Sequence, residues 1–213
     1  MSTVSIPDTP SQALARSIMG KNFLGIEEVR AGYGFSHTDE QRQLLSEIPF
    51  SDETLQRYKD THVLVAGAAL SFNEMRKIVK TNFLRLDFGF YLDKSYPRRK
   101  VRVRWHLLRD WALLGSCDKT YKEQTALLKG EEVPFACEMI YLVFLYYRTY
   151  RENLLPNIHV CCADRESGKR VIVGKFMGGD ELVVREWNGS KYPVRDIGLA
   201  SSVLPDKSRT LPA

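Results

Sequence analysis

Hydrophobic residues recur at helical spacing through the first half of the chain, and each such run begins with a capping pattern. Residues 9–12 place a threonine hydroxyl at the cap, a proline at the first helical position and a glutamine at the third. This pattern predicts a helix from residue 10 to about Met19 that ends at Gly20. The same kind of start predicts three further helices: Thr38 to about Ile48, from Ser51 onward, and Ser71 to about Lys80.

Apolar residues elsewhere follow the patterns of strands. The uninterrupted run 62–66 before Gly67 predicts a buried strand. Residues 100–107 alternate strictly, which predicts a central strand with one basic face. Apolar runs at 158–162, 170–176 and 181–187 predict a three-stranded antiparallel meander, because glycine-containing turns at 165–168 and 177–180 separate them.

The most apolar stretch, 134–151, predicts a long buried helix. Its longest uncharged run is nine residues, far fewer than the ~20 needed to cross a bilayer. Another helix is predicted from Thr120 to Gly130. The predicted fold class is α+β, with N-terminal helices, a central basic strand, a buried long helix and a C-terminal antiparallel β-meander. We expect residues 1–205 to form a single domain and 206–213 to be a frayed tail.

Composition places the chain among ordinary globular proteins, with 44% hydrophobic and 27% charged residues. The first residues lack the basic and apolar regions of a secretory signal, so we expect a cytoplasmic protein. In that reducing compartment the four cysteines are expected to be free thiols: Cys117, Cys137, Cys161 and Cys162.

Six short blocks of the sequence together resemble a family of bacterial hypothetical proteins without an assigned activity. The resemblance implies a bacterial, cytoplasmic protein and carries over no catalytic residue, cofactor or ligand. Three positions depart from the family pattern: Arg104, Met177 and Val203. The blocks are Ile-Pro-Phe-Ser (48–51), Trp-His-Leu-Leu-Arg (105–109), Lys-Thr-Tyr-Lys-Glu-Gln (119–124), Glu-Asn-Leu-Leu (152–155), Val-Gly-Lys-Phe (173–176) and Ile-Gly-Leu-Ala-Ser-Ser (197–202).

Positive charge is concentrated between residues 76 and 109. This segment has eleven basic and two acidic residues, a local charge of +9 in a chain of net charge +5. Cations neutralise phosphates, and the interleaved aromatic rings can stack on unpaired bases. We therefore predict non-catalytic binding of nucleic acid or another polyanion, in a protein of the kind that mobile elements encode. The predicted binding residues are Arg98, Arg99, Lys100, Arg102 and Arg104.

Other interpretations stay open. The basic residues can instead pair with acids such as Glu131, Glu132 and Glu138 on an ordinary solvated face. A second function is a protein-interaction or assembly module, in which the open edge of the meander or the basic face docks on an acidic partner. A third is an enzyme of unrecognised type, which a deep pocket with two or more titratable side chains would favour.

Chemical motifs are few. His159 and Cys161 share a strand face, but no second ligand pair completes a metal site. Cys117 is the one thiol expected near a helix N-terminus, where its pKa would fall. Glu123 is expected to cap a helix with Thr120 rather than act as a base. Because phosphate-binding loops are also absent, we predict no catalytic residue, metal or cofactor.

Overall fold

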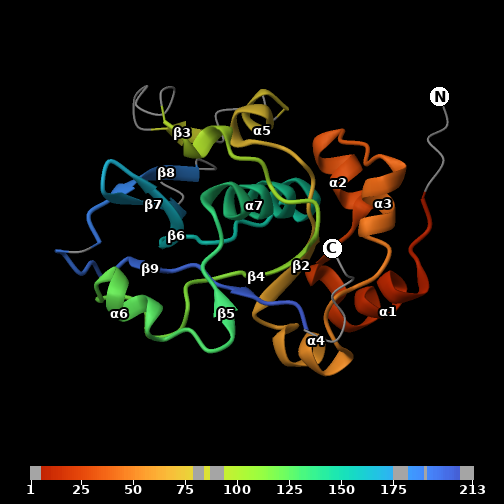
Figure 1. The fold of residues 1–213 in the computed structure, drawn as a ribbon, viewed down its shortest axis with the longest axis horizontal. Coiled ribbons are helices and arrows are strands. Elements are labelled where there is room, and N and C mark those ends of the chain that lie inside the picture. Colours follow the sequence, from red (N-terminus) through yellow and green to blue (C-terminus); the bar gives the residue numbers. More distant parts are fainter. Residues whose placement is uncertain (1–5, 79–83, 87–93, 175–181, 190, 207–213) are drawn as a thin grey trace.

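In a computed structural model of the chain, residues 6–78, 84–86, 94–174, 182–189 and 191–206 are described. Figure 1 shows the four N-terminal helices at one end of the molecule, a long helix α7 at the centre and a twisted sheet at the other end. Helices and two mixed sheets together make an α+β fold, which confirms the predicted class.

Three of the four N-terminal helices begin at predicted caps. The side chains of Thr9, Thr38 and Ser51 each accept a hydrogen bond from the backbone nitrogen three residues later. The third helix ends at Leu44 rather than near Ile48. The second helix and the 3-10 turn before it are not among the predicted elements. The elements are α1 (Pro10–Met19), η1 (Gly20–Asn22), α2 (Ile26–Tyr33), α3 (Asp39–Leu44) and α4 (Asp52–Tyr58).

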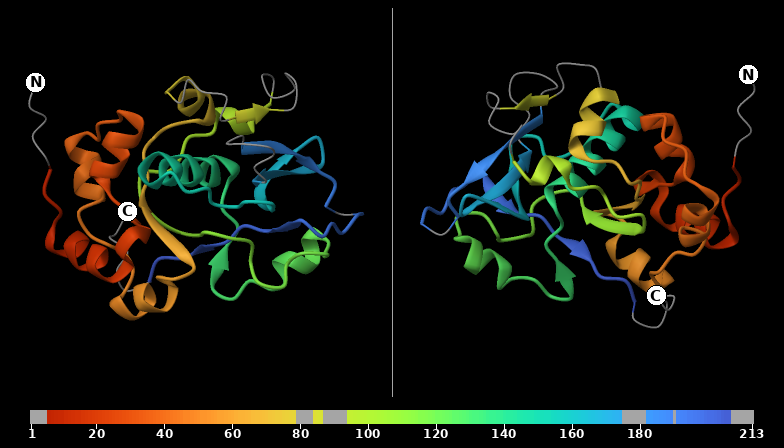
Figure 2. Two further views of the ribbon diagram at one scale, coloured as in Figure 1. Left: turned by 180° about the vertical axis from the view of Figure 1, so that it is seen from behind. Right: turned by 45° about the horizontal axis from the view of Figure 1, so that its top comes forward.

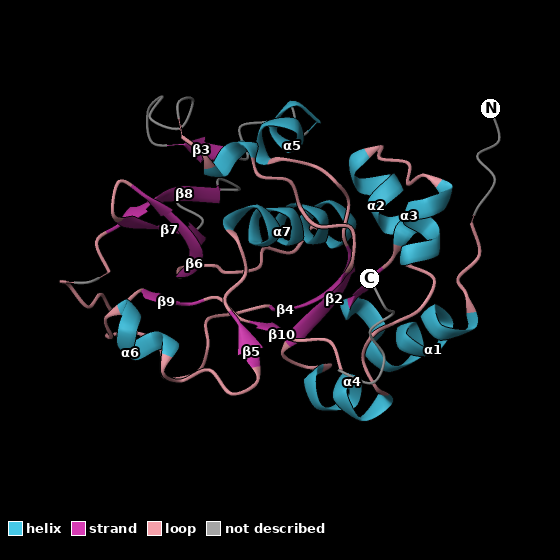
Figure 3. Ribbon diagram, in the orientation of Figure 1, coloured by secondary structure: helices cyan, strands magenta, loops and turns pink. Residues whose placement is uncertain are grey.

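The first sheet lies beside these helices, with the strand order β1-β2-β4-β10-β5. Strands β1 and β2 are parallel, and the other neighbours are antiparallel. The predicted strand at 62–66 is β2. Figure 3 shows β2, β4 and β10 side by side. The bounds are β1 (Phe23–Leu24), β2 (His62–Ala66), β4 (Trp105–Arg109), β5 (Glu131–Glu132) and β10 (Ser202–Val203).

The predicted strand at 100–107 is wrong in its bounds. Lys100 makes only an isolated bridge to Ser71, and the regular strand begins at Trp105. Between them the backbone nitrogen of Arg104 bonds to the carbonyl of Arg102, a turn that breaks the alternation. Within β4 residues 105–108 are all buried, so both faces of the strand are covered over most of its length.

The second sheet contains the predicted meander, β6-β7-β8, which is antiparallel throughout. Residues 167 and 168 both have positive φ, at 50° and 80°, as a two-residue type I′ hairpin turn requires. The other predicted turn, at 177–180, lies outside the described residues. The parallel strands β3 and β9 extend the sheet on either side. The bounds are β3 (Leu84–Leu86), β6 (His159–Glu166), β7 (Lys169–Gly174), β8 (Leu182–Trp187) and β9 (Ile197–Leu199).

Helix α7 (Ala136–Tyr150) confirms the predicted buried helix, since eleven of its fifteen residues are buried. It contacts α2 and α5 (Phe72–Ile78) on one side and β6 and β7 on the other. Figure 2 shows the same central position from behind. Two further short elements are η2 (Tyr96–Arg98) and α6 (Tyr121–Thr125). Helix α6 begins at the predicted Thr120–Glu123 capping box but ends well before Gly130. Among the described helices, none combines the length and apolar character needed to span a bilayer.

The C-terminal segment joins the two sheets. Strand β9 ends at Leu199 in the second sheet, and β10 begins at Ser202 in the first. Asp206, the first residue of the predicted tail, is held: its carboxylate accepts a hydrogen bond from the backbone nitrogen of Ser51, and its own nitrogen donates to Pro49. The rest of that tail lies outside the described residues.

Candidate functional site

The predicted basic surface begins at the last residue of η2, with three consecutive cations at 98–100. Arg98 is exposed and has no ion pair among the described residues. Arg99 Nε lies 3.2 Å from the buried carboxylate of Asp164, and its guanidinium stacks on a neighbouring aromatic ring. Lys100 Nζ lies 3.5 Å from Glu74, and the lysine side chain remains 57% exposed. Within the part of the chain that the structure describes, one of these three cations is thus unpaired, and the other two are balanced locally.

The next two predicted residues enter a cluster of opposite charges at the start of α7. Arg102 Nε lies 3.0 Å from the buried carboxylate of Glu138, and Arg104 pairs with Glu132 on β5. The second oxygen of Glu138 accepts a hydrogen bond from a backbone nitrogen at the helix start. Burial alone would raise the pKa of Glu138, but His106 and Arg102 outweigh it, so this pKa lies below its usual value. The arginines therefore stabilise a buried carboxylate.

Pairing continues beyond the five predicted residues. Lys94 contacts Glu186, and Arg109 lies 3.8 Å from Glu131. The ion pairs with Glu131, Glu132 and Glu138 that the structural interpretation expects are all present. Ion pairing does not by itself test nucleic-acid binding, which stays a prediction. It does lower the positive potential that such binding would use.

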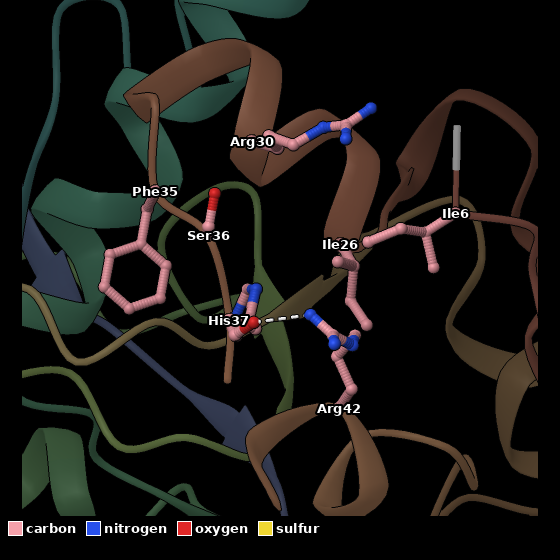
Figure 4. A pocket seen from close by; sticks show the side chains of 7 residues that line it. All are labelled: Ile6, Ile26, Arg30, Phe35, Ser36, His37 and Arg42. Atoms are coloured by element: carbon pink, nitrogen blue, oxygen red, sulfur yellow. Dashed lines mark hydrogen bonds between the residues drawn. The ribbon is translucent and has the colours of Figure 1, made fainter. Parts of the chain in front are cut away.

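A different site lies at the helical end, where a pocket of about 420 Å³ opens between α2 and α3. Figure 4 shows its side chains coming from α2, from the loop that follows it, from α3 and, at Ile6, from the segment before α1. The turn into this loop is made at Gly34, which ends α2 with φ of 66°. The pocket is lined by Ile6, Ile26, Arg30, Phe35, Ser36, His37 and Arg42.

His37 is the buried polar residue of this pocket, with 3% of its surface exposed. Its Nε2 lies 3.0 Å from the carbonyl oxygen of Gly67. Because a carbonyl oxygen only accepts, Nε2 must carry the hydrogen, and in the neutral ring Nδ1 is then an acceptor. Nδ1 has no hydrogen-bond partner among the described residues. Burial lowers the pKa of His37, which keeps the ring neutral at pH 7.

Gly67 holds His37 in place and is itself tightly enclosed. Its nitrogen donates to the carbonyl of Arg104, 2.9 Å away. A Cβ atom at this position would lie 2.0 Å from the carbonyl oxygen of Arg102. Only glycine fits so close to another backbone, so the histidine is anchored to a rigid part of the first sheet.

Two arginines line the same pocket as His37. Arg42 donates from Nη1 to the carbonyl of His37 at 2.7 Å and from Nη2 to the exposed carboxylate of Asp39. Arg30 donates to Glu27 at 2.6 Å, and the other oxygen of Glu27 accepts from the backbone nitrogen of Ile6. These bonds fix the walls of the pocket. The two bonds of Arg42 use two of the five donors that a guanidinium offers.

A second pocket, of about 300 Å³, lies beside α6. Arg170 stacks over the ring of Tyr121 there, 3.6 Å from its centroid, and Arg165 and Lys122 also line the pocket. These lining cations lie at the surface, fully or in part, and no buried polar atom of this pocket lacks a partner among the described residues. The first pocket is therefore the better candidate for a ligand.

The other candidates from the sequence are placed in structural roles. Cys117 precedes α6 by several residues, and burial together with two aspartates raises its pKa, contrary to the expectation for a reactive thiol. Cys161 is a free, buried thiol whose pKa burial raises to about 12. Glu123 caps α6 through Thr120, as predicted. Within the described ranges, no three His, Cys, Asp or Glu side chains gather as metal ligands do.

Sequence reasoning missed the pocket because it missed α2. Gly32 and Gly34 are typical of turns, although Ile26, Val29 and Tyr33 have the spacing of one helix face. Two glutamates in the first turn are a further helix signal. The contact between His37 and Gly67 joins residues thirty positions apart and has no local signature.

Comparisons of the chain with family models, with curated proteins and with solved structures found no match. The resemblance to bacterial hypothetical proteins therefore stays a prediction.

Proposed function

We propose that the protein binds a small organic anion in the pocket between α2 and α3. The observation that carries the proposal is the pair of guanidinium groups, of Arg30 and Arg42, that line the same pocket as three apolar side chains. Guanidinium groups bind carboxylates and phosphates.

Binding fits this pocket better than catalysis does. Among its lining residues, His37 alone has an ordinary pKa near neutrality. The two or more titratable side chains that would favour an enzyme are thus not present in it. Its volume of about 420 Å³ is within the range of ~300–1,000 Å³ common for small-molecule sites.

Calorimetry with a panel of small carboxylates and phosphates tests the proposal. Arg42→Gln removes one guanidinium, and Arg57→Gln removes an exposed one on α4 as the matched control. We expect Arg42→Gln to weaken binding by roughly tenfold or more, since a charge-assisted hydrogen bond contributes about 1.5–3 kcal/mol. The control should bind as the wild type does. Absence of binding by the whole panel, or equal affinity in both variants, would refute the proposal.

Polyanion binding through the basic segment is a second candidate, favoured by the exposure of Arg98 and Lys100. Its test is binding to single- and double-stranded oligonucleotides over a range of salt. On duplex DNA we expect the logarithm of the binding constant to fall linearly with the logarithm of the salt concentration, with a slope near −0.9 per neutralised phosphate. In Arg98→Gln this slope should be shallower by about one. Undetectable or salt-insensitive binding would remove this candidate. The ion pairs of Arg99, Arg102 and Arg104 count against it.

The protein-interaction alternative has less open strand edge than the sequence predicts. Strand β3 pairs with residues 182–184 of β8, and β9 pairs with residues 159–161 of β6, so part of each edge of the meander is covered. Docking of an acidic partner on the rest of these edges or on the basic face stays a prediction.

A further inference from the structure

We infer that the protein has a second site, for a doubly charged phosphate group, in the pocket of about 300 Å³ beside α6. The inference does not depend on the proposed function, because no residue lines both pockets. Three features carry it: three cations without carboxylate partners, two arginines that lie opposite each other in a hairpin, and the placement of the nearby acids on the other face of that hairpin.

The three cations come from two parts of the fold. Lys122 belongs to α6, whereas Arg165 and Arg170 belong to the neighbouring strands β6 and β7. Within the described ranges, none of the three forms an ion pair. Glu123, the acid next to Lys122 in sequence, already accepts both hydrogen bonds of the cap at Thr120. The pocket therefore carries positive charge that the described part of the chain does not neutralise.

The two arginines repel each other across the hairpin. Arg165 lies directly opposite Arg170 in the register of β6 and β7. Side chains of such a pair share one face, with Cβ atoms about 4.5–5.5 Å apart, and like charges there are destabilising. Arg170 is held in place, since Nη1 donates to the carbonyl of Ala163 at 2.8 Å and the guanidinium lies 3.6 Å from the centroid of the Tyr121 ring. An anion bound between the arginines would remove this repulsion.

The acids of the hairpin and of the next strand lie on the other face. Alternation along the strands places Glu166, Lys169 and Glu186 on the face opposite to the two arginines. There Glu186 pairs with Lys169 at 3.7 Å, and Glu166 accepts a hydrogen bond from the hydroxyl of Ser95 at 3.0 Å. These carboxylates are thus directed away from the pocket and do not repel an anion in it.

The charge and the size of the pocket favour a phosphate group. Guanidinium groups bind phosphate through paired hydrogen bonds, and a lysine ammonium adds a point charge. Several positive charges attract a doubly charged phosphate more strongly than a singly charged carboxylate. The volume of about 300 Å³ is at the lower end of small-molecule sites, so free phosphate or a small phosphate ester fits.

Calorimetry with three anions at pH 7.5 tests the class of ligand. Inorganic phosphate and glycerol 3-phosphate present the phosphate free or on an organic body, and glycerate carries a carboxylate instead. The phosphate ester is mostly doubly charged at this pH, since its second pKa is about 6. We expect both phosphates to bind roughly tenfold or more tightly than glycerate. Equal binding of glycerate overturns the phosphate class, and absence of phosphate binding up to about 10 mM overturns the site.

Two variants of the same hairpin locate the binding. Arg165→Gln removes an exposed cation of the pocket, and Lys169→Gln removes an equal charge from the other face as the matched control. We expect Arg165→Gln to weaken phosphate binding roughly tenfold, as the loss of one charge-assisted hydrogen bond allows. Lys169→Gln should weaken it less than about twofold, because water and salt screen the more distant charge. Equal losses in the two variants would indicate a general attraction to the basic chain and overturn the site.

Arg42→Gln separates this site from the proposed function. Phosphate bound beside α6 should have the same affinity for Arg42→Gln as for the wild type. Weakening by Arg42→Gln but not by Arg165→Gln would place the phosphate between α2 and α3, which overturns this inference and supports the proposed function.

The repulsion between the arginines gives a second measurement, which needs no ligand. In buffer without phosphate, the melting temperature of Arg165→Gln should lie about 1–3 °C above that of the wild type. Saturating phosphate should raise the melting temperature of the wild type more than that of the variant. A variant that melts below the wild type without phosphate would contradict the uncompensated repulsion on which the site depends.

Discussion

His62 lies at the start of β2 and is completely buried. Its Nδ1 is 2.9 Å from the hydroxyl oxygen of Thr61, and its ring meets that of Tyr58 edge-on. Nε2 has no partner within the described part of the chain. Burial, with a smaller contribution from Arg109, lowers the pKa of His62 to about 3. The folded protein thus holds this histidine neutral through mildly acidic conditions.

This histidine should make the protein less stable in acid. In the unfolded chain the pKa of His62 is about 6.5. Below that pH the histidine is therefore protonated in the unfolded state but stays neutral in the folded state. Stability contributed by the neutral ring is complete above pH 6.5 and is lost as the pH falls toward 3, by up to about 1.4 kcal/mol per pH unit. The lowered pKa of His37 acts in the same direction.

Urea unfolding of the wild type and of His62→Gln between pH 4 and pH 8 measures this effect. We expect the free energy of unfolding of the variant to fall less steeply below pH 6, by about 1 kcal/mol per pH unit. Carboxylates titrate in both proteins, so their contribution cancels in the difference. Parallel pH profiles would show that His62 is not the source.

At the scale of elements, the start of α7 is joined to the segment before β4 by charge. Glu138 is buried and accepts hydrogen bonds from Arg102 Nε and from the backbone nitrogen of Phe135, each at 3.0 Å. Nδ1 of His106 lies 3.6 Å from the same carboxylate. This cluster joins the first sheet, the central helix and the irregular segment before β4, so it positions all three.

Removing the negative charge of Glu138 should destabilise the fold. Glu138→Gln keeps the shape of the side chain and leaves Arg102, which is partly exposed, without its buried partner. We expect the free energy of unfolding to fall by at least about 2 kcal/mol. This loss is smaller than that expected for a fully buried ion pair, because water screens the partly exposed arginine. Chemical denaturation at pH 7 measures it.

The matched control is Glu152→Gln, which breaks the exposed pair between Lys21 and Glu152. Both side chains of that pair are more than half exposed, so we expect a change of no more than about 0.5 kcal/mol. Similar losses in the two variants would contradict the structural importance assigned to the buried cluster.

In the whole molecule, one cluster of buried hydrophobic residues reaches from the N-terminal helices through α7 to both sheets. Trp105 belongs to this cluster, whereas Trp187 belongs to a smaller one on the second sheet. The passage of the chain from β9 directly into β10 ties the sheets together. The single domain predicted for residues 1–205 is tested by whether both clusters unfold together.

Two single-tryptophan proteins report on the two clusters. One keeps Trp105 and the other keeps Trp187, with phenylalanine at the remaining tryptophans, including Trp111. In each protein we expect the fluorescence transition in urea to coincide with the far-UV circular dichroism transition, as in two-state unfolding. A fluorescence midpoint of the Trp187 protein clearly below its circular dichroism midpoint would show that the second sheet unfolds independently.

The sequence by itself determined the features that depend on neighbouring residues. Helix starts at Thr9, Ser51 and Thr120 were predictable because an N-cap joins residues only three positions apart. The long helix 134–151 and the meander were predictable from apolar runs and a glycine-containing turn. The pattern of charges also allowed the alternative that the basic segment pairs with nearby glutamates, and these ion pairs are present.

Tertiary structure decided what depends on residues distant in sequence. The alternation at 100–107 predicts a strand, but a turn at Arg102 interrupts it, so the regular strand begins only at Trp105. The parallel strands β3 and β9 join the meander from distant segments. The candidate pocket depends on His37 reaching Gly67, a contact chosen by the packing of the helical end on the first sheet. Such contacts are selected by the folding of the whole chain, and no local spacing records them.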